Sequence, residues 1–320
     1  MNVPAKPWKV ESQRTYFANA LVELGERDPN VVVVGADTTE SIKTISFGKK
    51  FPDRLWNLGI SEQNMISVAA GLAAAGKVAF ASTYAVFGAA HTYNVIRQSV
   101  AYTKLNVKVF CSHAGLTTGM DGATHQLNED IGLMRGLPNL AVLVPADGPQ
   151  TGKCVFAAAE RPGPVYCRFS RADFPTVTSP DDPFEIGPAY VMRDGTDVSL
   201  VGCGIMVSRC LEAADALAAE GVSAQVLNVP TVKPLDAGTL AKAARDTGAI
   251  VTAEEHTVVN GLGSAVAAAV AQEHPVPIEM VGVQDVFGES GDGFELLEKY
   301  GLTAAKVVEA ARRVVKRRGA

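Results

Sequence analysis

The chain has 320 residues, of which 47% are hydrophobic and 20% are charged, and its formal net charge is −5. This length is enough for two domains with cores of their own, and the composition is that of an ordinary globular protein. The negative charge, without any basic run, argues against a nucleic-acid-binding protein. We find no signal peptide or membrane span, so we expect a cytoplasmic protein whose partners are small molecules or other proteins.

The cysteines predict neither disulfides nor a metal site. They number five, form no CxxC pair, and most lie in apolar surroundings. Isolated cysteines of this kind are typical of reduced core residues. The run Glu254–His256 does not change this expectation, because three consecutive side chains cannot converge on one ion. We therefore expect no metal ligands in this chain.

Apolar runs rich in valine and isoleucine alternate with helical patterns along most of the chain. Runs that are apolar throughout, rather than at every second position, are typical of parallel strands covered by helices on both faces. The predicted strands are residues 31–35, 78–82, 106–112, 140–147, 164–169, 198–204, 224–229 and 249–255. The predicted fold class is therefore α/β, with two doubly wound domains and mainly parallel sheets.

This alternation is interrupted once, by a segment from Pro175 to Pro188 that is rich in proline, aspartate and serine. Such a composition is typical of a loop or linker rather than of a strand or helix. We place the domain boundary near residue 180, which divides the chain into residues 1–180 and 181–320.

Ligands of open α/β sheets bind beyond the carboxyl ends of the strands, so the loops at those ends are the ones to inspect. The first such loop carries Asp37 and Ser41, and the second carries Glu62 in the stretch GISEQNM. Ser61 suits the N-cap of the apolar helix that follows, and the helix dipole favours an acidic residue at a helix start. Glu62 is therefore compatible with a helix start as well as with a chemical role.

The most polar of these loops is CSHAGLTTGMDGATHQ, residues 111–126, which follows a predicted buried strand. It contains His113 and His125, two of the five histidines of the chain, together with Asp121 and three glycines. Taken separately, these residues are an ordinary turn and ordinary hydrogen-bonded histidines. Their occurrence in one chain with GISEQNM favours a functional site.

Both stretches resemble the transketolase family. GISEQNM is similar to the glutamate motif of transketolase-type thiamine-diphosphate enzymes. DGATHQ, followed by MRGLPNLAVLVPADG, is similar to a loop, helix and strand of transketolases and deoxyxylulose-phosphate synthases. KPLD and AEEHTVVNGLGSA, residues 233–236 and 253–265, resemble the family's carboxyl-terminal domain. The resemblance spans nearly the whole chain and implies a thiamine-diphosphate pyrimidine-binding fold followed by a transketolase C-terminal domain.

The resemblance implies thiamine diphosphate as the cofactor. Glu62 would be catalytic, because a carboxyl group that shares a proton with the pyrimidine ring activates the cofactor. Asp37 would lie near the cofactor. Tyr84 and Phe87 would line the pyrimidine ring, since stacking a neutral ring requires a flat apolar wall. Ala90 stands where longer transketolases have a third aromatic residue, so this wall departs from the family pattern.

The resemblance also implies a sugar phosphate as the substrate. His125 would be catalytic at the sugar's ketol or carbonyl oxygen, Asp121 would bind the acceptor's 2-hydroxyl, and His113 would reach substrate hydroxyls or phosphate. Guanidinium groups suit phosphate geometry. The positions that match the family's phosphate-binding residues are Arg14 in SQRTYF, Ser41 in ADTTES and Arg171 in CRFSRADF. Arg168 is an equally plausible interpretation of the last motif, although we prefer Arg171.

The cofactor's diphosphate and its metal need ligands that this sequence does not offer. In the family, a GDG motif and a later pair of asparagines mark the ligands of the diphosphate and the metal. Residues 291–293 are GDG, but no asparagine occurs after Asn260, and we interpret the match as fortuitous. Residues 260–264, NGLGS, lack the spacing of a dinucleotide site, and we interpret them as a tight loop.

The chain therefore resembles the second subunit of a split transketolase. The resemblance implies a partner subunit that carries the diphosphate-binding domain and the ligands of Mg²⁺ or Ca²⁺. It also implies a two-plus-two heterotetramer with a homodimer of this chain at its centre.

The predicted activity is transfer of a two-carbon ketol group between a ketose phosphate and an aldose phosphate, as in pentose phosphate metabolism. Three alternatives stay open. The beta subunit of a 2-oxoacid dehydrogenase has the same two-domain plan but no use for a sugar-binding DGATHQ loop. A deoxyxylulose-phosphate synthase shares the loop but normally holds its diphosphate domain in the same chain. A non-catalytic assembly or regulatory subunit would not need Glu62.

Overall fold

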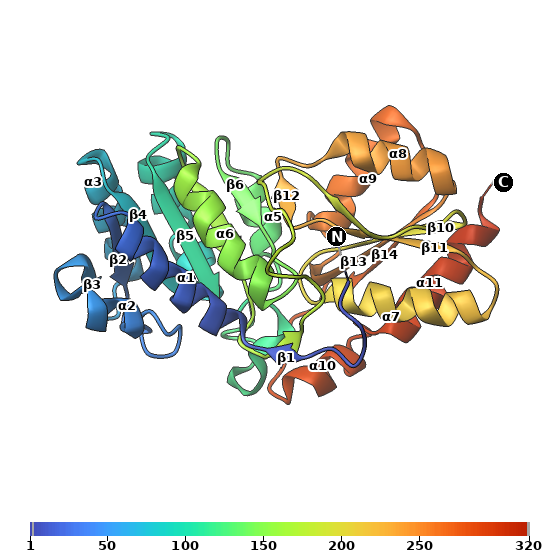
Figure 1. Cartoon of the computed structure of the whole chain (residues 1–320), viewed down its shortest axis with the longest axis horizontal. Helices are drawn as coiled ribbons and strands as arrows, with labels where there is room; N and C mark the ends of the chain where they lie inside the picture. The colour runs from blue at the N-terminus through green and yellow to red at the C-terminus, as the bar shows by residue number, and fades with distance from the viewer. Residues whose placement is uncertain (2, 319–320) are drawn as a thin grey trace.

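Figure 1 presents the computed structural model, which describes residues 1 and 3–318. Two sheets lie next to each other along the long axis of the molecule, and helices cover both faces of each. This is the predicted α/β class, with two sheets that are mainly parallel. The strands of the sheet nearer the N-terminus lie in the order β12-β6-β7-β5-β4-β2-β3, and those of the other sheet in the order β14-β13-β10-β11-β9.

The seven-stranded sheet is parallel except for one edge strand. Its parallel strands are β2 (Val31–Gly35), β3 (Leu55–Asn57), β4 (Val78–Tyr84), β5 (Val107–Ser112), β6 (Ala141–Leu143) and β7 (Val165–Arg168). The exception is β12 (Thr231–Lys233), which pairs with β6 in the antiparallel direction. Because β12 lies far beyond residue 180, the chain returns to the first sheet, and the division at residue 180 stays a prediction.

The strand β2 explains why an uninterrupted apolar run forms a central strand. Val31 and Val33 pack in one core cluster with residues of α1 (Gln13–Arg27), whereas Val32 and Val34 pack in another with residues of α3 (Glu62–Ala74). Successive side chains of a strand point to opposite faces, so a strand covered on both faces needs apolar residues at every position. Full burial of a valine contributes about 1.5–3 kcal/mol.

The five-stranded sheet has one antiparallel edge strand, β9 (Tyr190–Arg193), which pairs with β11. Its parallel strands are β10 (Val198–Gly202), β11 (Ala224–Asn228), β13 (Ile250–Thr257) and β14 (Ile278–Val283). In Figure 1, α7 (Met206–Ala219) and α11 (Ala304–Lys316) cover one face, and α8 (Ala237–Thr247) and α9 (Leu262–Glu273) cover the other.

The remaining helices and the smallest sheet complete the fold, and α6 (Gly148–Glu160) lies beside α1 on one face of the seven-stranded sheet (Figure 1). The other α-helices are α2 (Ile45–Lys50), α4 (Tyr93–Val95), α5 (Asp130–Arg135) and α10 (Gly293–Lys299). The 3₁₀-helices are η1 (Pro52–Arg54) and η4 (Leu116–Asp121), and the π-helical segments are η2 (Val86–His91) and η3 (Ile96–Ala101). A two-stranded antiparallel sheet joins β1 (Val10–Glu11) to β8 (Phe174–Pro175).

All eight predicted strands are present, but four strands of the two large sheets were not predicted. These are β3, β9, β12 and β14, and each lies at an edge of its sheet. Edge strands are short or partly exposed, so their sequences lack the continuous apolar signal of buried strands. The predicted strand 140–147 is also shorter than expected, because β6 ends at Leu143, before Pro145.

Two further expectations from the sequence concern cysteines and membranes. The five cysteines are free and buried, as predicted. None of the helices that the structure describes is long and apolar enough to cross a membrane.

Candidate active site

The predicted substrate residues come together at the carboxyl-terminal edge of the seven-stranded sheet. Tyr84 ends β4, His113 follows β5, and Ser41 follows β2. Arg14 lies in the first turn of α1, and Arg171 follows β7. Since the carboxyl ends of parallel strands meet at one edge, five segments far apart in the sequence contribute to one region.

Four rings form an aromatic cluster in this region. Tyr84 stacks on His113 with ring centroids 3.7 Å apart and planes 22° apart. Phe87 lies 6.0 Å from Tyr84 and meets His125 edge to face at 5.4 Å. Phe87 belongs to the π-helical segment η2, and π-helical turns are frequent at functional sites. The cluster brings two residues predicted for the cofactor next to two predicted for the sugar.

Polar groups of the predicted phosphate site adjoin the cluster. The hydroxyl groups of Ser41 and Tyr84 are 2.6 Å apart, and Nη1 of Arg14 donates to the backbone oxygen of Ser41 at 2.9 Å. Nη1 of Arg171 donates to the backbone oxygen of Thr118 at 3.4 Å. Arg14 and Arg171 are close enough for their charges to interact. The antiparallel pairing of β1 with β8 explains this, because Arg14 and Arg171 each lie three positions from the paired residues Glu11 and Phe174.

His113 is neutral in this surrounding. The pKa of His113 is lowered to about 3, chiefly by burial and in addition by the positive charges of Arg14 and Arg171, with a smaller contribution from His125. The imidazole is 1% exposed and its Nδ1 lies 2.7 Å from Oγ of Ser112. A neutral imidazole beside two guanidinium groups can hydrogen-bond an anionic or hydroxylated ligand without adding charge.

We call residues 113–126 the histidine loop, because they carry His113 and His125. It contains η4, and the backbone N–H groups of His125 and Gln126 both donate to the oxygen of Gly122. Nδ1 of His125 lies 2.9 Å from Oγ1 of Thr124. Asp121 ends η4 with an exposed side chain, which makes no hydrogen bond or ion pair within residues 1 and 3–318. The structure therefore brings His125 to the aromatic cluster but leaves Asp121 at the exposed rim of the histidine loop.

The two remaining residues predicted for the cofactor lie at a helix start and in a loop. Glu62 is the first residue of α3 and is 8% exposed, and its carboxylate has no hydrogen-bond or ion-pair partner in the described part of the chain. Ser61 occupies the N-cap as expected, but its side chain makes no capping hydrogen bond. Asp37 is exposed with a φ of 59°, and its backbone N–H donates to Oδ1 of Asn57.

The structure distinguishes the two arginines that the sequence left open. The side chain of Arg168 is 5% exposed, its Nε lies 3.3 Å from Oδ2 of Asp130, and its Nη2 donates to the backbone oxygen of Glu255 at 3.1 Å. These are contacts of a buried ion pair. Arg171 is exposed and only weakly bonded. The geometry therefore favours Arg171 for a ligand and gives Arg168 a structural role.

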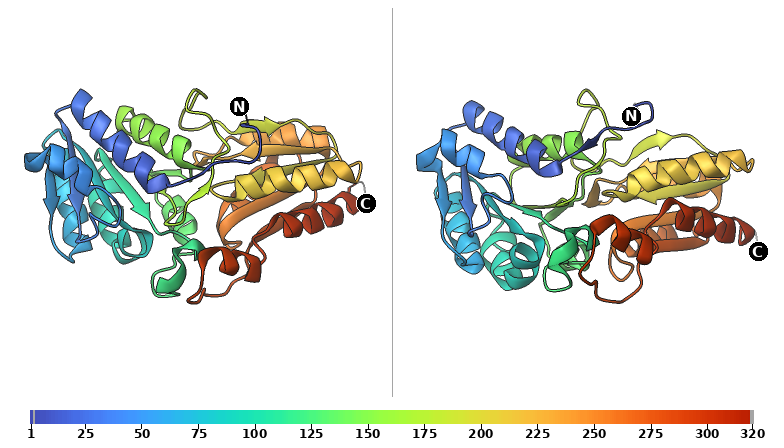
Figure 2. Two further views of the ribbon diagram at one scale, coloured as in Figure 1. Left: turned by 60° about the horizontal axis from the view of Figure 1, so that its bottom comes forward. Right: turned by 90° about the horizontal axis from the view of Figure 1, so that it is seen from below.

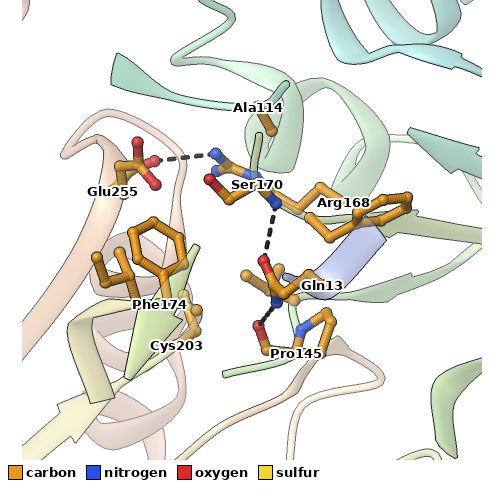
Figure 3. Close-up of a pocket in the computed structure, with 12 residues that line it drawn as sticks. Gln13, Ala114, Pro145, Arg168, Ser170, Phe174, Cys203 and Glu255 are labelled. Atoms are coloured by element: carbon orange, nitrogen blue, oxygen red, sulfur yellow. Dashed lines mark hydrogen bonds between the residues drawn. The ribbon is translucent and has the colours of Figure 1, made fainter. Parts of the chain in front are cut away.

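A network that the sequence did not reveal lies between the two sheets (Figure 3). The backbone N–H of Ser170 donates to Oε1 of Gln13 at 2.8 Å, and Nε2 of Gln13 donates to the oxygen of Pro145 at 3.0 Å. Glu255 reaches this network from β13. The cavity among these residues measures about 20 Å³, which is room for a single water molecule and not for a sugar.

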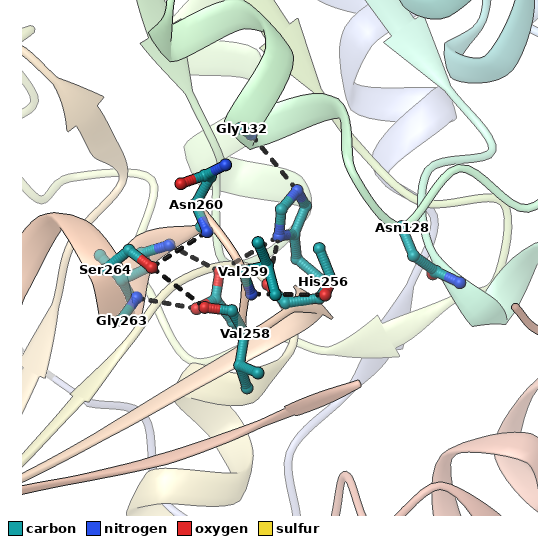
Figure 4. A network of polar contacts seen from close by, with 12 residues as sticks. Asn128, Gly132, His256, Val258, Val259, Asn260, Gly263 and Ser264 are labelled. Carbon is teal, nitrogen blue, oxygen red and sulfur yellow. Dashed lines mark hydrogen bonds and ion pairs between the residues drawn. The ribbon is translucent and has the colours of Figure 1, made fainter. Parts of the chain in front are cut away.

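The second polar network belongs to the run Glu254–His256 and α9 (Figure 4). Glu254 accepts the backbone N–H groups of Leu262 and Gly263 at 2.6 and 2.7 Å, and burial raises its pKa to about 7. Nε2 of His256 accepts the N–H of Gly132, and burial lowers the pKa of His256 to about 4. Residues 260–264 therefore include a helix start rather than only the predicted tight loop. Similarly, Asp292 of the GDG stretch is the N-cap of α10.

No group of three histidine, cysteine, aspartate or glutamate side chains that could hold a metal ion occurs within residues 1 and 3–318.

Comparison with known proteins identifies the class of this fold. Residues 11–176 match the model of the transketolase pyrimidine-binding domain, and residues 187–307 match that of the transketolase C-terminal domain. The transketolase of Leishmania mexicana, which is 24% identical, shares the fold with a TM-score of 0.80, and this chain covers 47% of it.

The particular relatives are single subunits of transketolases. A 6-deoxy-6-sulfo-D-fructose transketolase subunit of a Clostridium species is 40% identical over 95% of both chains. An apulose-4-phosphate transketolase subunit of Phocaeicola vulgatus is 34% identical over 95% of this chain and 97% of its own. A split-gene transketolase solved as an inactive beta4 tetramer is 51% identical, with a TM-score of 0.90 over 96% of this chain and 99% of that one. This chain belongs to the transketolase family and corresponds to its C-terminal section.

Proposed function

We propose that this chain is one subunit of a split, thiamine-diphosphate-dependent transketolase. With a second subunit, it would transfer a two-carbon ketol group from a ketose to an aldose that both carry a terminal anionic group. The observation that carries the proposal is the convergence of two arginines, a serine, two histidines and two aromatic rings at one sheet edge. These residues are Arg14, Arg171, Ser41, His113, His125, Tyr84 and Phe87.

Glu62 fits the pyrimidine half of the cofactor. Its carboxylate has no hydrogen-bond or ion-pair partner in the described part of the chain, so it is free to bond a protonatable ring nitrogen. When bound, thiamine diphosphate supplies the nucleophilic carbon that accepts and releases the two-carbon unit. Glu62 would hold the proton that it shares with the ring nitrogen, and Phe87 would provide part of the apolar wall.

The substrate's own groups would be bound by the aromatic cluster and its neighbours. His125 would hydrogen-bond the sugar's carbonyl oxygen, and Asp121 would bind the acceptor's 2-hydroxyl if the bound sugar reaches the rim of the histidine loop. His113, being neutral, would bond a hydroxyl or phosphate oxygen. Arg14 and Arg171 would bind the terminal anion in a charge-assisted manner, with the hydroxyl of Ser41 as a further donor.

The site and the relatives indicate a class of substrate, namely sugars with a terminal tetrahedral anion. One relative is named for a sulfo-sugar and another for a sugar phosphate, and a sulfonate and a phosphate are both tetrahedral anions. Two guanidinium groups at a fixed distance from the reacting carbon suit either anion. Ketose and aldose phosphates are therefore the first substrates to test, followed by sulfonated sugars.

We further propose that the ligands of the diphosphate and of Mg²⁺ or Ca²⁺ come from a partner subunit. The names of the relatives support this, since two are called subunits and one forms an inactive tetramer of beta chains. The assembly would be a two-plus-two heterotetramer with a homodimer of this chain at its centre.

The test is calorimetric titration of the isolated chain with thiamine diphosphate and magnesium, followed by assays with xylulose 5-phosphate and ribose 5-phosphate. We expect weak cofactor binding and no turnover for the chain alone, and both properties to appear when the diphosphate-domain subunit is added. In the complex, Glu62→Gln should retain assembly but lower turnover by orders of magnitude, because an amide cannot share the proton. Tight binding and turnover by this chain alone would refute the split-enzyme proposal.

A further inference from the structure

Glu255 contacts the histidine loop although it lies in the other sheet. It belongs to β13 and is 7% exposed. Its Oε1 accepts two hydrogen bonds from Thr117, one from the backbone N–H and one from the hydroxyl group, both at 2.7 Å. A β-carbon on Gly115 would overlap the same carboxylate, so the loop approaches it as closely as its backbone permits. The start of the histidine loop is thus bound to the C-terminal domain by a carboxylate.

The same carboxylate ends a directed chain of hydrogen bonds. The single proton of the Thr117 hydroxyl goes to Glu255, so the Ser170 hydroxyl, 2.9 Å away, must donate to Thr117. Oγ of Ser170 in turn accepts the backbone N–H of Ala172 at 3.1 Å. Arg171 lies between Ser170 and Ala172. The backbone that carries Arg171 is therefore held, through two hydroxyl groups, by Glu255.

The chain of contacts continues to Arg14, the second arginine proposed to bind the substrate's anionic group. The backbone N–H of Ser170 donates to Gln13, which precedes Arg14, and Figure 3 shows this bond next to Glu255. On the other side, the backbone oxygen of Glu255 accepts from the buried Arg168. One residue of β13 is therefore connected to the histidine loop and to both segments that carry the site arginines.

Other parts of the C-terminal domain hold the same loop. In both views of Figure 2, η4 lies beside α10. Nε2 of Gln126 donates to the backbone oxygen of Glu289 at 2.9 Å, and a β-carbon on Gly293 would lie 3.1 Å from Cα of Thr117. The loop is thus braced by further segments of the C-terminal domain.

We propose that Glu255 is a positioning residue of the active site, which holds the histidine loop and the Arg171 segment in the geometry that binds the sugar and its anionic group. On this view the C-terminal domain acts on catalysis by bracing a loop of the other domain. The inference rests on the proposed function for its kinetic consequence, but the bracing itself can be measured without activity.

The chain offers a matched control in the adjacent Glu254. Both glutamates are buried on β13, and both accept two hydrogen bonds that include backbone N–H groups. Glu254, however, bonds to the start of α9 and lies 3.6 Å from Nδ1 of His256, and both contacts are within its own domain. Glu254→Gln therefore removes a buried charge from the same strand without releasing the histidine loop.

The first measurement is amide hydrogen exchange, followed by mass spectrometry, on the full chain. Glu255→Ala should raise exchange in residues 115–126 by about tenfold or more, since the Thr117 amide loses its acceptor. Glu254→Gln should raise exchange only in residues 258–266. If Glu255→Ala does not fold, Thr117→Val makes a weaker test from the loop side, because it removes both hydroxyl bonds while the Thr117 amide keeps its acceptor; a smaller rise in exchange of the loop is then expected. Unchanged exchange of the loop in the folded variant would overturn the proposal.

The second measurement is kinetics of the complex with the diphosphate-domain subunit. Glu255→Ala should raise KM for phosphorylated acceptors about tenfold while kcat falls less, and Glu255→Gln should recover most of the loss, because its amide oxygen still accepts from Thr117. Glu254→Gln should change KM by less than about twofold. An active wild-type complex whose KM is unaffected by Glu255→Ala would overturn the positioning role. A wild-type complex without transketolase activity would instead refute the proposed function and leave the exchange result in place.

Discussion

At the scale of single residues, the candidate site has charged arginine side chains next to a neutral histidine that can form hydrogen bonds. Arg14 and Arg171 supply positive charge near His113, whose burial and cationic neighbours keep it neutral. The ion pair of Arg168 with Asp130 lies deeper, where it holds β7 rather than a ligand. The three arginines thus have different surroundings, although two of them match the same sequence motif.

Replacing these arginines should separate binding from stability. Arg14→Ala and Arg171→Ala should each raise KM for phosphorylated sugars more than for the unphosphorylated analogues, because each removes a charge-assisted donor. Arg168→Ala should instead lower the free energy of unfolding by roughly 3–5 kcal/mol, because the buried carboxylate of Asp130 loses its cationic partner and keeps the hydrogen bond from the Tyr166 hydroxyl. Steady-state kinetics and urea denaturation provide the measurements. Equal weakening of both substrate sets by Arg14→Ala would assign that residue a structural role.

The neutral His113 should make stability depend on pH. Its pKa is about 3 in the folded chain and near 6.5 when unfolded, so between these values the unfolded chain binds more protons. Its contribution is therefore fully present above about pH 6.5 and is lost as the pH falls towards 3. We expect unfolding by urea at pH 5 to require less free energy than at pH 7.5, and His113→Asn to reduce this difference. The buried His256 contributes a slope of the same sign, which should persist in the variant.

At the scale of elements, the histidine loop is the part of the chain most dependent on its surroundings. Its 3₁₀-helix is short and kinked at Gly119, and its hydrogen bonds lead to β13 and to the segment before α10. Short 3₁₀ turns contribute little stability by themselves. The loop therefore takes its shape from two segments of the C-terminal domain.

Gly115 offers a test of this dependence, and Gly76 is its matched control. Both have positive φ, 83° and 89°, but a β-carbon on Gly76 would meet no atom within 4 Å. Gly76→Ala should cost about 1–2 kcal/mol from backbone strain alone. Gly115→Ala should cost roughly 1–3 kcal/mol more, because its methyl group would displace the Glu255 carboxylate. Denaturant titration of both variants measures the difference, and equal losses would contradict a tight contact at Gly115.

At the scale of the whole molecule, the two sheets are parts of one packed unit. One core cluster contains Val142 and Tyr166 of the first sheet together with Val201 and Leu227 of the second. The strand β12 extends the first sheet although it follows most of the second in the sequence. A continuous core favours cooperative unfolding.

We therefore expect the chain to unfold in a single transition. Scanning calorimetry should give equal calorimetric and van't Hoff enthalpies, since neither sheet can lose its neighbour without exposing shared apolar surface. A fragment that ends at residue 180 should not reproduce the native circular dichroism of its sheet, because it lacks β12. Two well-separated transitions would contradict this expectation.

Much of the fold could be predicted from the sequence because the signals are local. Runs such as residues 31–35 are apolar at every position, and only a strand covered on both faces needs that pattern. The start of α3 at Glu62 and the position of the histidine loop after β5 follow from similar local patterns. Strands at the edge of a sheet need no continuous apolar run. For this reason the sequence did not predict the edge strands β3, β9, β12 and β14.

The fold class, the family and the residue types available for chemistry could be inferred from the amino-acid sequence alone. Which of these residues meet depends on how the two sheets pack. The tertiary structure placed Arg168 in an ion pair and Arg171 at the surface, although both fit one motif. It also joined Glu255 to Thr117, 138 positions away in the sequence, and Thr117 to Ser170, 53 positions away. Such contacts leave no periodic signal, because a hydrogen bond between distant segments depends on how two sheets pack and not on the residues beside each partner.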